Sequence, residues 1–303
     1  MPSFKGFLLG KVMKISVKTA LGRSLSDMET NDIRQKLDQI ASKLGKHPKG
    51  CKIKTIQIDG MYGEWYIPEN ALQGKVILYL HGGAYEYCSA KTHGPLAARI
   101  GDAAGLKVLL PEYRLAPEHP FPAAIEDAIK VYHWLLGQGY DSSDIIFAGD
   151  SAGGGLSVVT ALVLREQNEP LPAAIICLSP WVDLTSSGVS YSKNKVVDPY
   201  LKVDEVREAA RMYAGKERLD HPLISPIFAD LTGLPPLFIQ VGDQELLLSD
   251  AQMLAERAKA SGVKVNLKVY EGMWHVWQMT SFLPEAKQAM KEIGEYIKRT
   301  VLT

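Results

Sequence analysis

The residues of this chain that could do chemistry are a serine between glycines, a glycine pair and a late histidine. Ser151 is the middle of a Gly-Asp-Ser-Ala-Gly sequence at positions 149–153. An apolar run at 145–148 precedes it, and a helix-forming run at 156–164 follows it. A serine at such a strand-to-helix turn projects its hydroxyl above the end of a sheet, with glycines where the backbone is crowded. The pattern therefore predicts a nucleophilic serine at residue 151.

A second group of residues could stabilise the negative charge that nucleophilic attack on a carbonyl creates. A His-Gly-Gly-Ala sequence at positions 81–84 follows the apolar run 76–80. Because glycine has no Cβ, its backbone N–H can approach a ligand closely. We predict that the N–H groups of Gly82, Gly83 and Ala152 form an oxyanion hole.

A serine nucleophile also needs a base, and seven histidines compete for this role. His275 lies in a Gly-Met-Trp-His-Val-Trp sequence just after the last apolar run, 265–269. The carboxyl ends of parallel strands meet at one edge of a sheet, so this position brings His275 to the same edge as Ser151. We therefore predict His275 as the general base.

An acid that orients this base should follow the penultimate strand, predicted at 237–241. Asp243, Glu245 and Asp250 all lie in the segment that follows. Ser249 and a glutamine three residues later form a capping-box pattern, which places Asp250 in the first turn of a helix. The spacing of the residues alone leaves both Asp243 and Glu245 open as the acid.

The elements that must position these residues are short apolar runs separated by helix-forming stretches. Continuous apolar runs indicate strands that are buried on both faces, and their alternation with helices indicates a mostly parallel sheet with right-handed crossovers. The sequence thus predicts an α/β fold with an eight-stranded, mostly parallel sheet flanked by helices and opening with a hairpin. The predicted strands are 53–58, 63–67, 76–80, 107–110, 145–147, 174–178, 237–241 and 265–269.

The interval from 183 to about 225 breaks this alternation, since it contains a helix-forming stretch at 203–214 but no buried strand. At the N-terminus, helical spacing of apolar residues predicts one amphipathic helix from Phe4 to Ile15 and a second from about residue 26 to 44. We predict one catalytic domain, 1–303, with a helical cap formed by about 1–48 and about 185–222. Whether the N-terminal helices pack on the domain or act as a lid is left open by the sequence.

Composition narrows the classes of function. Lysine plus arginine equals aspartate plus glutamate, 34 of each, so nothing favours nucleic acid or an anionic membrane as a partner. The three cysteines have no metal-ligand spacing and cannot form a disulfide framework. No run is long enough to span a bilayer, and the N-terminal apolar run is interrupted by lysines. We predict a cytoplasmic protein without stable membrane insertion, metal or organic cofactor.

Four motifs in order give the chain a resemblance to a known family. They are the sequence at 81–83, the Pro-Glu-Tyr-Arg-Leu-Ala-Pro-Glu sequence at 111–118, the nucleophile sequence at 149–154 and the Ser-Pro-Trp-Val-Asp-Leu sequence at 179–184. Along nearly its whole length the chain resembles the bacterial hormone-sensitive-lipase family of α/β-hydrolase esterases.

This resemblance implies a serine carboxylesterase with Ser151 as nucleophile, His275 as base and an acid between 243 and 250. Many relatives have an aspartate followed by Pro-Leu there, and this chain departs from that pattern. It looks like the subgroup in which a glutamate is the acid, so the resemblance implies Glu245. Relatives often dimerise through the last strand, which makes a homodimer an option here.

The expected substrate is an uncharged ester with a short to medium acyl chain. The resemblance implies such substrates, and some relatives with a similar Gly-Met-Trp-His-Val-Trp sequence act on lactones. Apolar and aromatic residues in the segments near the predicted site also indicate an apolar pocket. They are Tyr85, Tyr87, Trp181, Tyr200, Met212, Tyr213, Trp274 and Trp277.

Two alternatives remain at the level of sequence. One is a serine peptidase or amidase on the same fold, although no charged or peptide-shaped site is identifiable. The other is a non-catalytic ligand-binding protein of the same fold, which the presence of His275 disfavours.

Overall fold

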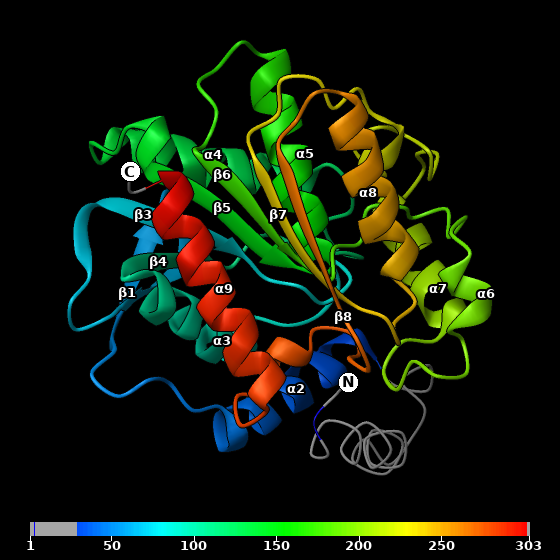
Figure 1. Cartoon of the computed structure of the whole chain (residues 1–303), viewed down its shortest axis with the longest axis horizontal. Coiled ribbons are helices and arrows are strands. Elements are labelled where there is room, and N and C mark those ends of the chain that lie inside the picture. The colour runs from blue at the N-terminus through cyan, green and yellow to red at the C-terminus, as the bar shows by residue number, and fades with distance from the viewer. Residues whose placement is uncertain (1–2, 4–28, 302–303) are drawn as a thin grey trace.

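The computed structural model of the protein describes Ser3 and residues 29–301, and a twisted sheet lies at its centre (Figure 1). Its eight strands follow the order β1-β2-β4-β3-β5-β6-β7-β8. β2 pairs antiparallel with β1 and β4, and all other neighbours are parallel. The predicted mostly parallel sheet that opens with a hairpin is confirmed. The strands are β1 (Lys52–Ile58), β2 (Met61–Ile67), β3 (Leu72–Leu80), β4 (Leu106–Pro111), β5 (Ile145–Asp150), β6 (Ala174–Leu178), β7 (Leu237–Gly242) and β8 (Val265–Tyr270).

The middle of the sheet is buried on both faces. Every residue of β5, β6 and β7 is buried, as continuous apolar runs predict for strands covered on both sides. The edge strands β1 and β8 contain exposed residues instead. The loops that leave the central strands therefore start from a rigid, close-packed base.

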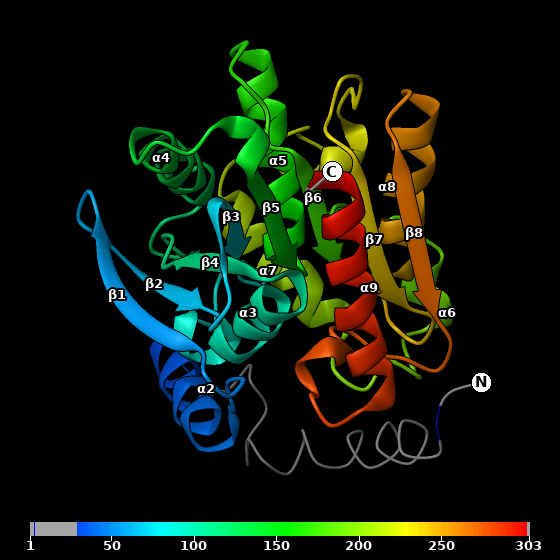
Figure 2. The ribbon, with the colours of Figure 1, turned by 60° about the vertical axis from the view of Figure 1, so that its left-hand side comes forward.

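Helices cover the two faces of this sheet. α3 and α9 lie together on one face, whereas α4, α5 and α8 lie on the other (Figure 2). Among residues 29–301, no helix combines the length and hydropathy needed to cross a membrane. The helices are α2 (Thr30–Leu44), α3 (Ala90–Ala104), α4 (Ala123–Gly137), α5 (Ala152–Glu166), α6 (Ser190–Lys193), α7 (Val203–Ala214), α8 (Leu248–Ala260) and α9 (Pro284–Val301), with 3₁₀ turns η2 (Ser142–Asp144), η3 (Pro226–Phe228) and η4 (Trp277–Met279).

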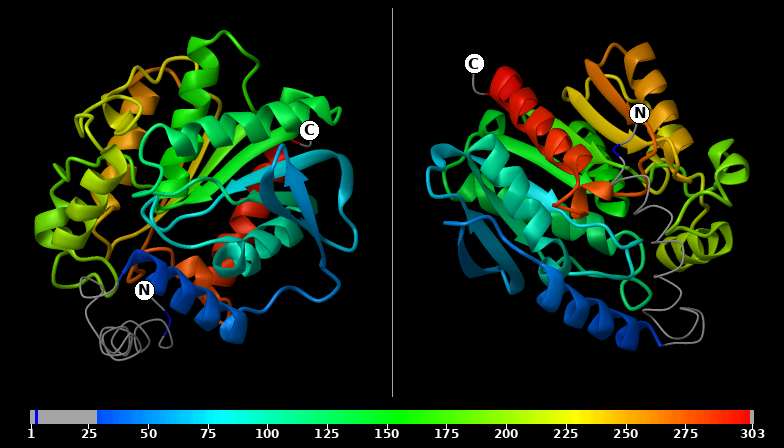
Figure 3. Two further views of the ribbon diagram at one scale, coloured as in Figure 1. Left: turned by 180° about the vertical axis from the view of Figure 1, so that it is seen from behind. Right: turned by 60° about the horizontal axis from the view of Figure 1, so that its bottom comes forward.

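The segment between β6 and β7 is an insertion that contains α6, α7 and η3 but no strand. The predicted helix at 203–214 is confirmed as α7. Of the predicted N-terminal helices, the structure describes α2, while the first helix and residues 26–28 lie outside the described residues. Both α2 and the insertion lie at the end of the molecule to which the carboxyl ends of the parallel strands point (Figure 3).

An arginine fixes α2 on the loops that leave the sheet. Arg34 Nε donates to the carbonyl of Glu86, which follows β3, and Arg34 Nη2 donates to the carbonyl of Ala116, which follows β4, both at 2.7 Å. The same guanidinium pairs with Glu118 at 2.8 Å. The described part of the N-terminal region is thus joined to the loops above the sheet.

The contact between α3 and α9 depends on one glycine. A Cβ on Gly294 would lie 2.2 Å from the carbonyl oxygen of Ala103, which is backbone and cannot move aside. We expect Gly294→Ala to lower the free energy of unfolding by about 1–3 kcal/mol, because the helices must separate. Urea denaturation of the variant measures this loss.

The matched control is Gly137→Ala, at the exposed end of α4. A Cβ there meets nothing within 4 Å. We expect this variant to be unchanged or more stable by up to about 1 kcal/mol, because alanine favours helix over glycine. Equal effects of the two substitutions would contradict the close approach of α3 and α9.

Candidate active site

Ser151 occupies the sharp turn between β5 and α5. Its backbone has φ 52° and ψ −123°, a strained conformation for a residue with a side chain. A Cβ on Gly153 would lie 2.0 Å from the carbonyl oxygen of Leu80, and one on Gly149 would lie 2.3 Å from that of Gly153. Only glycine fits at these two positions, so the sequence at 149–153 produces the predicted elbow.

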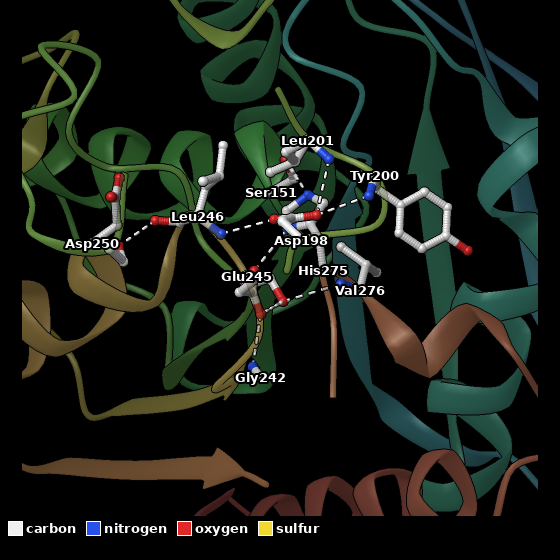
Figure 4. A network of polar contacts seen from close by, with 12 residues as sticks. Ser151, Asp198, Tyr200, Leu201, Gly242, Glu245, Leu246, Asp250, His275 and Val276 are labelled. Atoms are coloured by element: carbon white, nitrogen blue, oxygen red, sulfur yellow. Dashed lines mark hydrogen bonds and ion pairs between the residues drawn. The ribbon is translucent and has the colours of Figure 1, made fainter. Parts of the chain in front are cut away.

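The structure brings Ser151, His275 and Glu245 together from the ends of three strands. With the imidazole proton on Nδ1, Ser151 Oγ donates to His275 Nε2 at 3.1 Å and His275 Nδ1 donates to Glu245 Oε2 at 2.8 Å. Figure 4 shows the three side chains in one continuous chain of contacts. The arrangement is that of a nucleophile, a base and an orienting acid.

Of the two carboxylates that the sequence left open, Glu245 is the one that contacts the imidazole. Glu245 is fully buried, and its Oε1 accepts from the N–H of Gly242 at 2.7 Å and from Ser179 Oγ at 2.8 Å. The side chain of Asp243 instead binds the loop that precedes His275, where its Oδ1 accepts from the N–H of Gly272 at 2.7 Å. Asp243 therefore braces the loop that carries the histidine instead of contacting it.

The capping-box pattern at Ser249 predicted the place of Asp250 correctly but not the cap. Asp250 lies in the first turn of α8, whereas α8 begins at Leu248 and has no side-chain cap, so the predicted capping box is wrong. The buried Oδ2 of Asp250 accepts instead from the N–H groups of Val182 and Asp183, at 3.1 and 2.9 Å. Burial, followed by the charge of Asp183, raises the pKa of Asp250 well above its ordinary value. Asp250 thus fixes the start of the insertion to α8.

The predicted oxyanion donors divide into two groups. The N–H of Gly82 already donates to Asp150 Oδ1 at 3.1 Å. Within residues 29–301, the N–H groups of Gly83, Ala84 and Ala152 donate to no acceptor. The structure therefore places Gly82 in a supporting position and leaves the other donors free for a ligand.

Asp150 is the centre of a buried network that sequence reasoning missed. Besides Gly82, its carboxylate accepts from the hydroxyl of Tyr79 at 2.6 Å and lies 3.1 Å from His93 Nε2. Burial opposes ionisation, but His93, Tyr79 and His81 hold the pKa of Asp150 below its ordinary value. Its place next to Ser151 was a signal that this side chain faces the glycine loop.

Other features of the surface do not belong to this site. A surface cavity of about 430 Å³ lies over α4 and is lined by Glu126, Lys130, His133 and Trp134 among others, none of which contacts the Ser151 network. In the part of the chain that the structure describes, no group of three or more histidine, cysteine or acidic side chains is arranged to hold a metal ion.

Comparison with known proteins agrees with this geometry. The family model of the alpha/beta hydrolase fold matches residues 77–279. A crystal structure of an esterase from the bacterial hormone-sensitive lipase family is 40% identical, covers 99% of this chain and 100% of that one, and has a TM-score of 0.93. The chain belongs to this family. The resemblance inferred from four motifs is confirmed.

Two relatives in the family extend the match. An acetyl-hydrolase of Streptomyces hygroscopicus is 43% identical over 236 residues, or 78% of this chain and 79% of that protein. An esterase of Acinetobacter venetianus is 35% identical over 295 residues, or 97% and 96% of the two chains. This family member is thus similar to esterases over almost its full length.

The contrast between Glu245 and Asp243 is directly testable. We expect Glu245→Gln to lower kcat for p-nitrophenyl ester hydrolysis by about 10³–10⁴-fold, because the amide cannot stabilise the imidazolium. Asp243→Asn keeps an acceptor for Gly272 and should stay within about threefold of the parent enzyme. Similar losses in both variants would contradict the assignment of Glu245.

The pH dependence follows from the environment of His275. Burial lowers its pKa, but the hydrogen bond and charge of Glu245, together with Asp198 and Asp150, raise it above the ordinary value. Because the base must be neutral, kcat/KM falls as the pH drops through this raised pKa. Glu245→Gln removes the main raising cause, so the acid limb of its residual activity should move to lower pH. An unmoved limb would show that another group sets it.

Proposed function

We propose that this protein is a serine carboxylesterase that hydrolyses short- to medium-chain acyl esters through an acyl-enzyme intermediate. The observation that carries the proposal is the chain of hydrogen bonds from Glu245 through His275 to Ser151, 2.8 and 3.1 Å long. The order nucleophile, acid, base along the sequence is that of α/β-hydrolases. Relatives described as esterases support the same reaction.

In the acylation half of the reaction, Ser151 Oγ attacks the ester carbonyl carbon while His275 Nε2 takes the hydroxyl proton. Glu245 keeps the Nδ1 proton in place and stabilises the imidazolium. When the tetrahedral intermediate collapses, the proton on Nε2 passes to the departing alcohol oxygen. The acyl group then remains as an ester on Ser151.

The oxyanion of this intermediate is stabilised by the N–H groups of Gly83 and Ala152. The N–H of Ala84, which is equally free of an acceptor among the described residues, is the next donor along the loop. Gly82 contributes indirectly, since its bond to Asp150 holds the loop against the elbow. Donors fixed in this way need no reorganisation as charge develops.

Deacylation reverses the roles of the same groups. His275 Nε2 takes a proton from water, and the hydroxide adds to the acyl carbon. The second tetrahedral intermediate collapses, the proton on Nε2 returns to Ser151 Oγ, and the carboxylic acid leaves. No metal or organic cofactor is required by any step.

The acyl preference rests on an aromatic cluster beside the nucleophile. The N–H of Trp181 donates to the carbonyl of Ser151 at 2.9 Å. The ring of Tyr85 lies 6.2 Å from that of Trp181 and stacks at 3.7 Å on Tyr213 of α7. All three side chains are at most 2% exposed, and Trp277 is likewise buried, in the core on the face of the sheet that α9 covers. Such a cluster suits an uncharged acyl chain, and the related esterase EstE5 was soaked with p-nitrophenyl butyrate.

Several finer features stay predictions. They are activity on lactones, a cytoplasmic location, a homodimer, and a cap drawn from about 1–48 and about 185–222. A serine peptidase or amidase, or a non-catalytic binding protein, would each give a different result in the assays that follow.

The decisive variant is Ser151→Ala. We expect hydrolysis of p-nitrophenyl acetate and butyrate to fall by about 10⁴-fold or more, because the nucleophile is lost. A phosphonate ester should label the parent enzyme at one serine and leave the variant unlabelled. Retained turnover without Ser151 would refute the mechanism.

A substrate panel separates the alternatives. Short and medium p-nitrophenyl esters should be cleaved, and the matching anilides should be cleaved far more slowly. Faster turnover of anilides would favour an amidase. Absence of both turnover and phosphonate labelling in the parent enzyme would favour a binding protein.

A further inference from the structure

The loop that carries Glu245 is held by side chains that come from the insertion. Asn194 follows α6 within the insertion, some fifty positions earlier in the chain, and its Nδ2 donates to the carbonyls of Asp243 and Glu245 at 3.0 and 2.8 Å. Buried carbonyls of a loop need such partners. We call residues 243–247, between β7 and α8, the acid loop. One amide thus holds two carbonyls of this loop.

Asp198 binds the next backbone group of the acid loop, the N–H of Leu246, which shares a peptide unit with the carbonyl of Glu245. Its Oδ2 accepts from the N–H of Leu246 at 2.8 Å, while its Oδ1 accepts from the N–H groups of Tyr200 and Leu201 at 2.8 and 2.9 Å. The carbonyl of Glu245 and the N–H of Leu246 belong to one peptide plane. Asn194 and Asp198 thus fix both polar atoms of the peptide plane that directs the Glu245 side chain. Figure 4 shows the bond between Leu246 and Asp198.

Ser190, also in the insertion, contacts the junction between the acid loop and α8. Its Oγ donates to the carbonyl of Leu246 and accepts from the N–H of Ser249 at 3.0 Å. In return, Ser249 Oγ accepts from the N–H of Ser190 at 2.9 Å. We call Ser190, Asn194 and Asp198 the acid-loop clamp.

Asp198 also adds a charge close to the imidazole. The carboxylates that face His275 are Glu245 after β7, Asp150 at the end of β5, and Asp198 from the insertion. Burial raises the pKa of Asp198 above its ordinary value, and His275 and the N–H groups that it accepts from act in the opposite direction and limit this rise. Three N–H donors favour the ionised form of a carboxylate, and an anion at this place stabilises an imidazolium.

We propose that the acid-loop clamp makes the insertion a working part of the triad, with Asn194 and Asp198 as positioning residues for Glu245 and His275. This inference rests on the proposed function. Catalysis is sensitive to displacements of about 1 Å in a catalytic group, and a buried loop without regular structure holds such a position only through bonds of this kind.

Two variants separate the parts of the clamp. Asn194→Ala removes both bonds to the loop carbonyls without changing any charge. We expect kcat to fall by about tenfold, with KM within about twofold and the acid limb of kcat/KM unmoved.

Asp198→Asn turns an N–H₂ toward a backbone N–H and removes the charge. Here kcat should fall by about 10–100-fold, and the acid limb should move to lower pH by about half a unit.

Two further variants serve as controls. Asp220→Asn removes an exposed aspartate of the same insertion, paired with Arg218, and should leave kcat and the acid limb unchanged. Asp198→Glu restores the charge at a shifted position. It should return the acid limb toward that of the parent enzyme while kcat stays low.

The outcomes that overturn the inference are distinct from those that overturn the function. Parental kcat in both Asn194→Ala and Asp198→Asn would refute the clamp. If Asp198→Asn fails to fold, Asn194→Ala decides alone by its kcat and KM. Turnover in a parallel Ser151→Ala sample would refute the proposed mechanism, whereas an inactive Ser151→Ala with unaffected clamp variants would refute only this inference.

Discussion

The rest of this structure depends on one constraint, which is that a fully buried carboxylate beside an imidazole must find hydrogen-bond donors for its oxygens. A buried carboxylate without such donors would destabilise the fold. Glu245 avoids this because it accepts from the N–H of Gly242, from Ser179 Oγ and from His275 Nδ1. These donors lie at or just after the ends of β7, β6 and β8, so the parallel strands must end at one level. The fully buried central sheet holds them there.

A second buried carboxylate, Asp150, meets the same constraint on the other side of the nucleophile. It accepts from Tyr79 on β3, from the glycine loop at Gly82 and from His93 on α3. The carboxylate therefore joins the elbow to the glycine loop that follows β3. Strained backbone conformations cluster at the same place, with φ of 58° at Ala84 and 52° at Ser151. Such conformations persist only where surrounding bonds fix them, as these bonds do.

Local sequence patterns predict where a strand ends, but they do not predict which way a side chain in an irregular loop points. Ser151 and His275 were predictable because each follows an apolar strand whose carboxyl end must meet the others. The direction of a side chain in an irregular loop is set by distant partners, so the spacing of residues left Asp243 and Glu245 open. The bond of Gly82 to Asp150 and the misjudged cap at Ser249 have the same cause, since partners 59 to 68 positions away took up these groups. Asn194 and Asp198 carried no signal, because nothing in their periodicity points to the acid loop.

The insertion supplies hydrogen-bond partners to buried backbone groups, as the need to satisfy buried polar groups requires. The loop that carries Glu245 lies between β7 and α8 and is neither helix nor strand, so its backbone groups lack the partners that regular structure supplies. The peptide between Glu245 and Leu246 obtains them from Asn194 and Asp198. The start of the insertion is fixed in turn by Asp250, in the first turn of α8 just after the same loop. Acid loop and insertion thus satisfy each other's buried polar groups. Changes in the insertion are therefore constrained to keep these few side chains, all of which precede α7.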